Sequence, residues 1–107
     1  MMSELPLDDE HAPIYSMGQV ADMLNVQQAY LRRLDEHDVV TPSRSEGGRR
    51  RYSRRDIMTV QRVTRMAGEG MTLIAIRRIL ELEREVDRLR EELAAAHARL
   101  EQRESGS

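Results

Sequence analysis

The sequence predicts a mainly α-helical chain: a helix-turn-helix with a small β-hairpin wing, two following helices and a C-terminal coiled-coil dimerisation helix. Three observations lead to this prediction. Two short amphipathic segments meet at Asn25, a glycine pair at 47–48 separates two strand-like segments, and an apolar heptad begins at Ile79. These patterns are typical of a helix-turn-helix, a tight hairpin and a coiled coil, respectively.

Helix start signals place the first two helices. Residues 1–13 hold four acids and two prolines without periodicity, which predicts a disordered acidic tail. Ser16 and Gln19 form a capping-box pattern, and apolar residues then recur at helical spacing up to Leu24. Asn25 suits the left-handed position of a tight turn. A second helix over 27–37 then exposes the polar residues Gln27, Gln28, Tyr30, Arg32 and Arg33.

The next segment predicts a hairpin and two more helices. Pro42 ends the helical pair, and Gly47-Gly48 suits the positive φ angles of a hairpin tip. Ser53 then caps a third helix, which Gly68 and Gly70 end, and Thr72 caps a fourth. These elements form one predicted domain over residues 14–78.

The C-terminal part repeats apolar residues at spacings of three and four. The repeat predicts a dimerisation coiled coil over 79–103, followed by a frayed end at 104–107. A helix folded back on its own domain is the alternative. The charges beside the stripe mix both signs and leave the orientation of the two helices open. The stripe consists of Ile79, Leu82, Val86, Leu89, Leu93, Ala96 and Leu100.

Composition excludes several kinds of site. The 107 residues include no cysteine, so disulfides, thiolate metal sites and cysteine nucleophiles are excluded. The three histidines stand singly at His11, His37 and His97, so we expect no metal and no cofactor. No apolar run approaches the roughly 20 residues of a membrane span. The N-terminus is acidic, unlike a signal peptide. We therefore expect a cytoplasmic protein without a membrane partner.

Positive charge is concentrated in the middle of the chain. The net charge is −2, yet residues 27–65 hold ten arginines against five acids, a net charge of +5. Within "EGGRRRYSRRD" (46–56) five arginines repel one another unless an anion compensates. Alternation along the strand directs Arg49 and Arg51 to one side and Arg50 to the other. The density of charge favours an anionic partner over a solvated loop.

The order of these elements resembles the MerR family of winged-helix transcription regulators. "SMGQVADMLNV" is similar to the family's first helix and turn, "YLRRLDEHDVVTP" to its recognition helix, and "GGRRRY" to its Gly-Gly-x-Arg-x-Tyr wing signature. "SRRDI" and "GMTLIAIRRIL" are similar to the segments leading to the dimerisation helix. The resemblance covers about residues 14–100. "SEGGRRRYS" and "IRRILELE" bring it closest to the heat-shock repressor branch.

The resemblance implies a homodimer that binds inverted-repeat operators in promoter DNA and represses, with stress genes as targets. Three positions depart from the family pattern. Asp38 stands where glycine is usual, so that helix should end differently. Leu34 replaces a common aromatic and Tyr30 a small threonine, which alters the recognition surface.

The expected DNA contacts combine side-chain chemistry with this resemblance. Glutamine and arginine read adenine and guanine edges in the major groove. A helix N-terminus such as that at Ser16 presents N–H groups to a phosphate. The resemblance makes Arg32 a phosphate ligand and Tyr52 a phosphate donor, although Tyr52 also suits a core. The candidates for base contacts are Gln27, Gln28, Tyr30 and Arg33. The complete set is Ser16, Gln27, Gln28, Tyr30, Arg32, Arg33, Arg44, Arg49, Arg50, Arg51 and Tyr52.

Two other functions remain open. In one, the chain is a protein-interaction module whose helix-turn-helix docks a chaperone or an RNA polymerase component such as a sigma factor. In the other, it is an architectural DNA binder with little sequence preference. An enzyme is not expected, because the sequence holds no paired carboxylates, no nucleophile–base arrangement and no phosphate loop.

Overall fold

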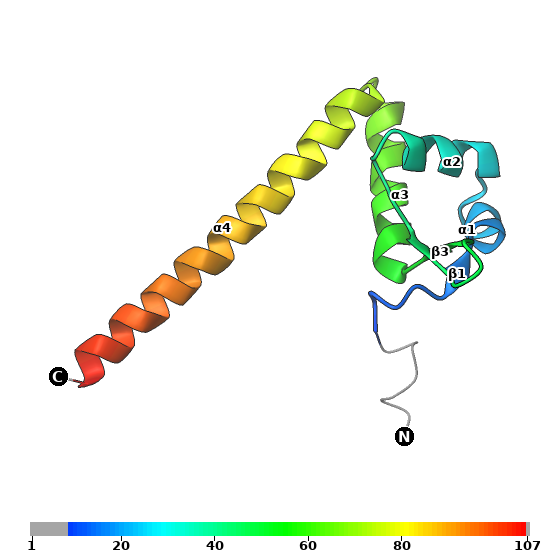
Figure 1. Cartoon of the computed structure of the whole chain (residues 1–107). Coiled ribbons are helices and arrows are strands. Elements are labelled where there is room, and N and C mark those ends of the chain that lie inside the picture. Colours follow the sequence, from blue (N-terminus) through cyan, green and yellow to red (C-terminus); the bar gives the residue numbers. More distant parts are fainter. Residues whose placement is uncertain (1–8, 107) are drawn as a thin grey trace. The chain divides into compact units, whose positions relative to one another are not determined.

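The computed structural model describes residues 9–106, which form helices and one small antiparallel sheet (Figure 1). The mainly helical fold class is therefore confirmed. The chain divides into two compact units, Met1–Arg77 and Arg78–Ser107. In chain order the elements are β1 (Tyr15–Ser16), α1 (Met17–Leu24), α2 (Gln28–Glu36), β2 (Ser43–Arg44), β3 (Arg50–Tyr52), α3 (Arg54–Gly68) and α4 (Leu73–Gly106).

The expected acidic tail lies largely outside the described residues, which begin at Asp9. Residues 9–13 form a turn in which the Ala12 N–H donates to the Asp9 carbonyl at 3.2 Å. The Glu10 carbonyl accepts from the Arg55 N–H at 3.0 Å, at the start of α3. The described part of this segment therefore has local structure where the sequence predicted disorder.

The helices begin at the capping residues that the sequence predicts. Ser16 and Gln19 form the expected capping box, with hydrogen bonds of 3.1 and 2.8 Å. Ser53 and Asp56 form a second one at the start of α3, with hydrogen bonds of 3.0 and 2.9 Å. Each box satisfies two backbone N–H groups that have no acceptor within a helix.

Three of the helices end in the same way. Asn25 after α1, Asp38 after α2 and Gly70 after α3 all take positive φ, at 53°, 56° and 96°. The residue after each one donates its N–H to the carbonyl five positions earlier, at 3.0, 2.8 and 3.2 Å. This is the Schellman arrangement. The prediction for Asn25 is confirmed, whereas the expectation that Asp38 would change the helix end is wrong. Aspartate tolerates this conformation and occupies it as glycine would.

The sheet has β3 at its centre, between β1 and β2. Arg51 lies opposite Ser16 on one side and Ser43 on the other. The sequence predicts the hairpin but not β1, because a two-residue strand carries no periodic signal. This missed strand fixes the start of α1 beside the hairpin.

The hairpin tip differs in detail from the expectation. Of the two glycines, Gly48 has a positive φ, 77°, and Gly47 does not. The Gly48 N–H donates to the Ser45 carbonyl at 2.9 Å, and the Ser45 N–H donates to the Arg49 carbonyl at 2.8 Å. A four-residue turn, Ser45–Gly48, whose last residue is left-handed therefore connects the strands.

The core of the first unit gathers apolar side chains from the helices around one tyrosine. Tyr52 is the largest of the fully buried side chains, which are less than 2% exposed. The others are Leu31, Leu34, Ile76, Val20, Val60 and Val63. Packing of α1, α2 and α3 through these residues fixes the surface that the polar side chains occupy.

The predicted fourth helix and coil form one continuous helix, α4. Its 34 residues span about 51 Å at ~1.5 Å per residue. The helix runs to Gly106, so the frayed end expected from residue 104 is not seen in the described residues, and Ser107 lies outside them. Ile79 and Ala96 of the stripe are half-buried. Its other five members, Leu82, Val86, Leu89, Leu93 and Leu100, are 44–57% exposed.

The two glycines at the end of α3 should respond to alanine in opposite directions. Gly68 is helical and Gly70 left-handed, and an added Cβ would meet nothing within 4 Å at either. We expect Gly68→Ala to raise the free energy of unfolding by up to about 1 kcal/mol. Gly70→Ala should lower it by about 1 kcal/mol. Chemical denaturation of both variants measures this, and a shift of the same sign in both would contradict the assigned helix end.

Candidate nucleic-acid interface

Six of the predicted site residues line one concavity on the first unit. It has a volume of about 400 Å³ and lies between the start of α1, the start of α2 and the hairpin. Met17, Gly18 and Gly48 complete its wall. The predicted residues in it are Ser16, Gln28, Arg44, Arg49, Arg50 and Arg51. Residues up to 35 positions apart in sequence thus form a single basic surface.

The start of α1 gives this concavity backbone donors. Ser16 uses its hydroxyl to cap the Gln19 N–H, so the N–H groups of Met17 and Gly18 have no acceptor within the helix. A Cβ on Gly18 would lie 3.5 Å from the amide nitrogen of Gln28. The positive end of the α1 dipole therefore lies close to a side-chain amide of α2.

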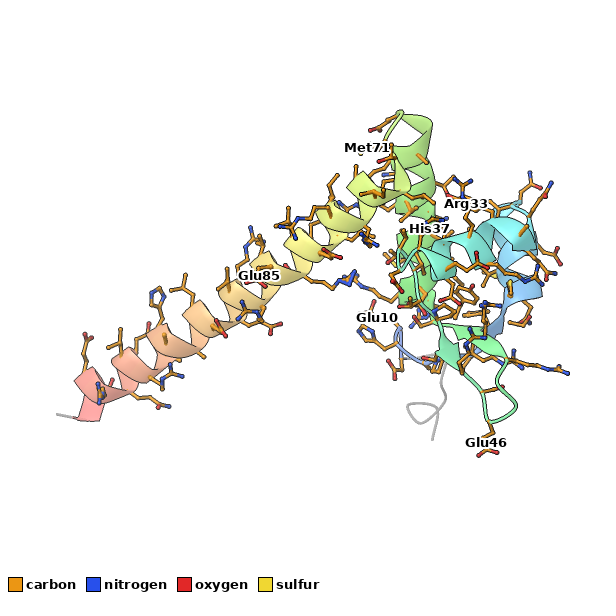
Figure 2. The ribbon with its side chains drawn as sticks, turned by 45° about the horizontal axis from the view of Figure 1, so that its top comes forward. Glu10, Arg33, His37, Glu46, Met71 and Glu85 are labelled. Atoms are coloured by element: carbon orange, nitrogen blue, oxygen red, sulfur yellow. The ribbon has the colours of Figure 1, made fainter. Side chains whose placement is uncertain are left out.

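Strand alternation divides the hairpin arginines as the sequence predicts. Arg44 and Arg50 are register partners, and both donate to the carboxylate of Asp35 on α2. Arg51 points to the other face, where its Nη1 donates to the Arg50 carbonyl at 3.1 Å. Arg49 is exposed. Glu46 lies at the outer end of the loop between β2 and β3, pointing away from the helices (Figure 2).

Asp35 is a site residue that the sequence analysis missed. Its Oδ2 accepts from Arg50 Nε at 2.7 Å and from Arg44 Nη2 at 3.3 Å. It follows an arginine-rich stretch of α2 and carries no motif of its own. Asp35 lies four residues after Leu31 and one after Leu34, so it is beside the buried face of α2. This position was the only sequence feature that could have indicated an interaction within the protein.

Tyr52 is a core residue. It is 1% exposed, and its buried hydroxyl has no hydrogen-bond partner among the described residues. Burial raises the pKa of this hydroxyl above its usual value, so the group stays neutral. The phosphate contact that the resemblance implies is therefore not available on the described surface, because β3 turns this side chain inward together with Arg50.

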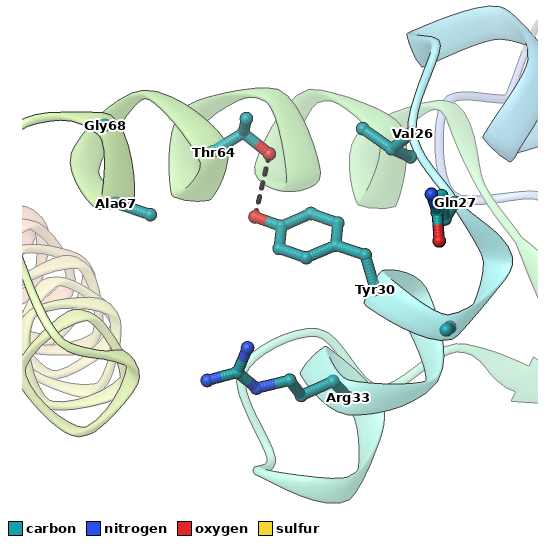
Figure 3. A pocket seen from close by; sticks show the side chains of 8 residues that line it. Val26, Gln27, Tyr30, Arg33, Thr64, Ala67 and Gly68 are labelled. Atoms are coloured by element: carbon teal, nitrogen blue, oxygen red, sulfur yellow. Dashed lines mark hydrogen bonds between the residues drawn. The ribbon is translucent and has the colours of Figure 1, made fainter.

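Tyr30, Gln27 and Arg33 line a different hollow, between α2 and α3. This hollow has a volume of about 650 Å³ and is completed by Val26, Ala29, Thr64, Ala67 and Gly68. Tyr30 reaches across it, and its hydroxyl shares a 2.9 Å hydrogen bond with that of Thr64 (Figure 3). In this structure Tyr30 thus contacts α3, and its base contact remains a prediction.

The outward face of α2 follows from helical spacing at 100° per residue. It carries two arginines, one acid, one alanine and one glutamine, all of them exposed. These are Gln28, Ala29, Arg32, Arg33 and Glu36. Gln28 belongs both to this face and to the concavity. The face and the concavity are therefore adjacent.

Four guanidinium groups, the positive N-terminal end of α1 and a side-chain amide suit an extended anion such as a phosphate backbone. Within residues 9–106, no group of three acidic or histidine side chains is placed to hold a metal ion. The helices of this same range include none with the length and apolarity needed to cross a bilayer. The chemistry that this surface offers is anion binding by arginine and backbone.

The comparison with known families agrees with this arrangement. Residues 15–83 match the model of the MerR HTH family regulatory proteins. The chain belongs to the MerR family. Heat shock protein HspR of Streptomyces coelicolor is 38% identical over 91 residues, which is 81% of this chain and 60% of that protein. GlnR of Bacillus anthracis, an HTH-type transcriptional regulator, is 27% identical over 73 residues, 68% of this chain and 57% of that protein. The chain thus spans about 60% of the length of these relatives.

Solved MerR structures share the fold. HiNmlR, a MerR family regulator lacking the sensor domain and bound to promoter DNA, matches with a TM-score of 0.57 and 22% identity, over 75% of this chain and 87% of that one. The N-terminal part of MtaN, the multidrug transporter activator of Bacillus subtilis, matches with a TM-score of 0.59 and 21% identity, over 80% and 97%.

Proposed function

We propose that this MerR-family chain is a cytoplasmic, sequence-specific DNA-binding transcription regulator that represses through inverted-repeat operators as a homodimer. It acts without a cofactor and without a catalytic site. The observation that carries the proposal is the concavity itself, in which the α1 N-terminus, Gln28 and four arginines surround one space. A phosphate backbone matches its positive charge.

In this proposal α2 enters the major groove and the wing holds the flanking backbone. The N-terminal residues of a recognition helix are those that meet base edges. Gln28 suits adenine, and the neighbouring Ala29 suits a thymine methyl group. Arg32 and Arg33 lie one turn further on, where the helix leaves the groove and meets phosphates. Gln27 remains a candidate at the start of the helix.

Three hairpin arginines have two different roles. Arg49 and Arg51 contact phosphates, while Arg50 holds the hairpin against α2 through Asp35. Ser16 contributes through the helix start that it caps, rather than through its hydroxyl. Tyr52 supports the strand from within the core.

The repressor role and the link to stress genes are supported by the similarity to HspR, a heat shock protein. The dimer is supported by the apolar stripe of α4, whose larger side chains are about half exposed in a single chain. Five such residues on one helix favour burial against a second copy of this chain, because the two identical heptad repeats can pack against each other. Twofold symmetry then requires two half-sites.

Retention of genomic DNA fragments by the purified protein, at near-physiological salt, tests the function. We expect the retained fragments to share an inverted repeat upstream of a few genes. Retention without a common sequence would instead support the architectural DNA binder. If the protein retains no DNA, the proposal is wrong and a protein partner, such as a chaperone or an RNA polymerase component, must meet the basic surface.

A charge placed in the stripe should separate the protomers. Leu89→Asp puts a carboxylate into the predicted interface, where its desolvation opposes association. Sedimentation at micromolar concentration should therefore show a monomer. Ala98→Asp is the matched control, because residue 98 lies on the opposite side of the heptad and is exposed. A dimer that survives Leu89→Asp as well as Ala98→Asp would contradict the coil.

A further inference from the structure

The Asp35 carboxylate links the recognition helix to both strands of the wing. Its Oδ2 accepts from Arg50 Nε of β3 at 2.7 Å and from Arg44 Nη2 of β2 at 3.3 Å. The side chains of Asp35 and Arg50 are only 15% and 19% exposed, so solvent screens this pair weakly. Arg44 also donates from Nη1 to the Gly48 carbonyl at 3.2 Å. One oxygen atom thus connects α2 to both strands and, through Arg44, to the hairpin turn.

By charge alone, this carboxylate opposes the binding of an anion. It pairs with two arginines that line the concavity and cancels part of their positive potential. Its benefit must therefore be geometric. Arg44 and Arg50 are opposed across the hairpin and would repel each other without it. A hairpin of two and three residues is also too short to hold its own position firmly.

We propose that Asp35 is a positioning residue that sets the spacing between the outward face of α2 and the wing. This inference rests on the proposed DNA-binding function. Two contact surfaces joined rigidly bind one duplex more tightly than two surfaces that move independently. Asp35 thus raises DNA affinity and selectivity, although its negative charge by itself repels DNA.

The test compares Asp35→Asn with Asp38→Asn on the selected operator and on unrelated DNA. Both variants remove one negative charge by the same chemical change. Asp38 is exposed, and asparagine tolerates its left-handed conformation. We expect Asp35→Asn to weaken operator binding about tenfold or more, the effect of a lost charged hydrogen bond, and to reduce the ratio of operator to unrelated binding. Asp38→Asn should bind as the parent does, or slightly more tightly. Operator binding by Asp35→Asn that equals that of Asp38→Asn would overturn the proposal.

Two further measurements separate positioning from simple stabilisation. Without DNA, amide exchange at Ser45 and Gly48, whose N–H groups close the hairpin, should be about tenfold faster in Asp35→Asn and unchanged in Asp38→Asn. Asp35→Glu keeps the charge but displaces the carboxylate by one methylene group, so it should retain affinity for unrelated DNA and lose selectivity. Unchanged exchange in the first variant, or unchanged selectivity in the second, would overturn the proposal. If the parent binds no DNA, the proposed function itself fails, whereas the exchange result still reports on Asp35.

Discussion

Strand β3 pairs along both of its edges within three residues of chain, and the basic surface depends on this pairing. On one edge it holds Ser16, the residue that caps α1, opposite Arg51. On the other edge it holds β2, which brings Arg44 opposite Arg50. Backbone hydrogen bonds therefore place a helix N-terminus and four arginines around one space, although their charges repel. The compensating attraction inside the protein comes from Asp35, and the remaining positive charge is left for an external anion.

Alternation along β3 separates the side chains that hold the basic surface in place from the side chains that it exposes. Arg50 and Tyr52 point inward, the first to Asp35 and the second into the core. Arg49 and Arg51 are left on the outer side, and all three arginines line the concavity. Arg50 and Tyr52, at fixed positions of the wing signature, thus position the strand, and Arg49 and Arg51, at its variable positions, are the residues that we propose contact DNA. On α2, Tyr30 bonds to Thr64 of α3 and so links the two helices.

Features that depend on local sequence were predictable. Capping boxes at Ser16 and Ser53, and the turn at Asn25, follow from side chains that bond to backbone within a few residues. The family resemblance and the heptad were equally local patterns. In contrast, strand β1, the two arginine partners of Asp35 and the burial of the Tyr52 hydroxyl depend on residues nine or more positions away. Helical periodicity gives the face on which a residue lies, but not which distant group will meet it. Strand alternation separated Arg50 from Arg49 and Arg51, but it did not show which of the two sides faces Asp35.

The salt dependence of DNA binding tests the central claim, that the outer wing arginines grip phosphates, most directly. Each phosphate contact adds about 0.9 to the slope of log affinity against log salt. Arg49→Ala and Arg51→Ala should each lower the slope by about that amount on every DNA sequence. Arg84→Ala, on the side of α4 away from the stripe and exposed, should leave it unchanged. Slopes equal to that of the parent in both wing variants would contradict the account, and the basic surface would then have to face something other than a phosphate backbone.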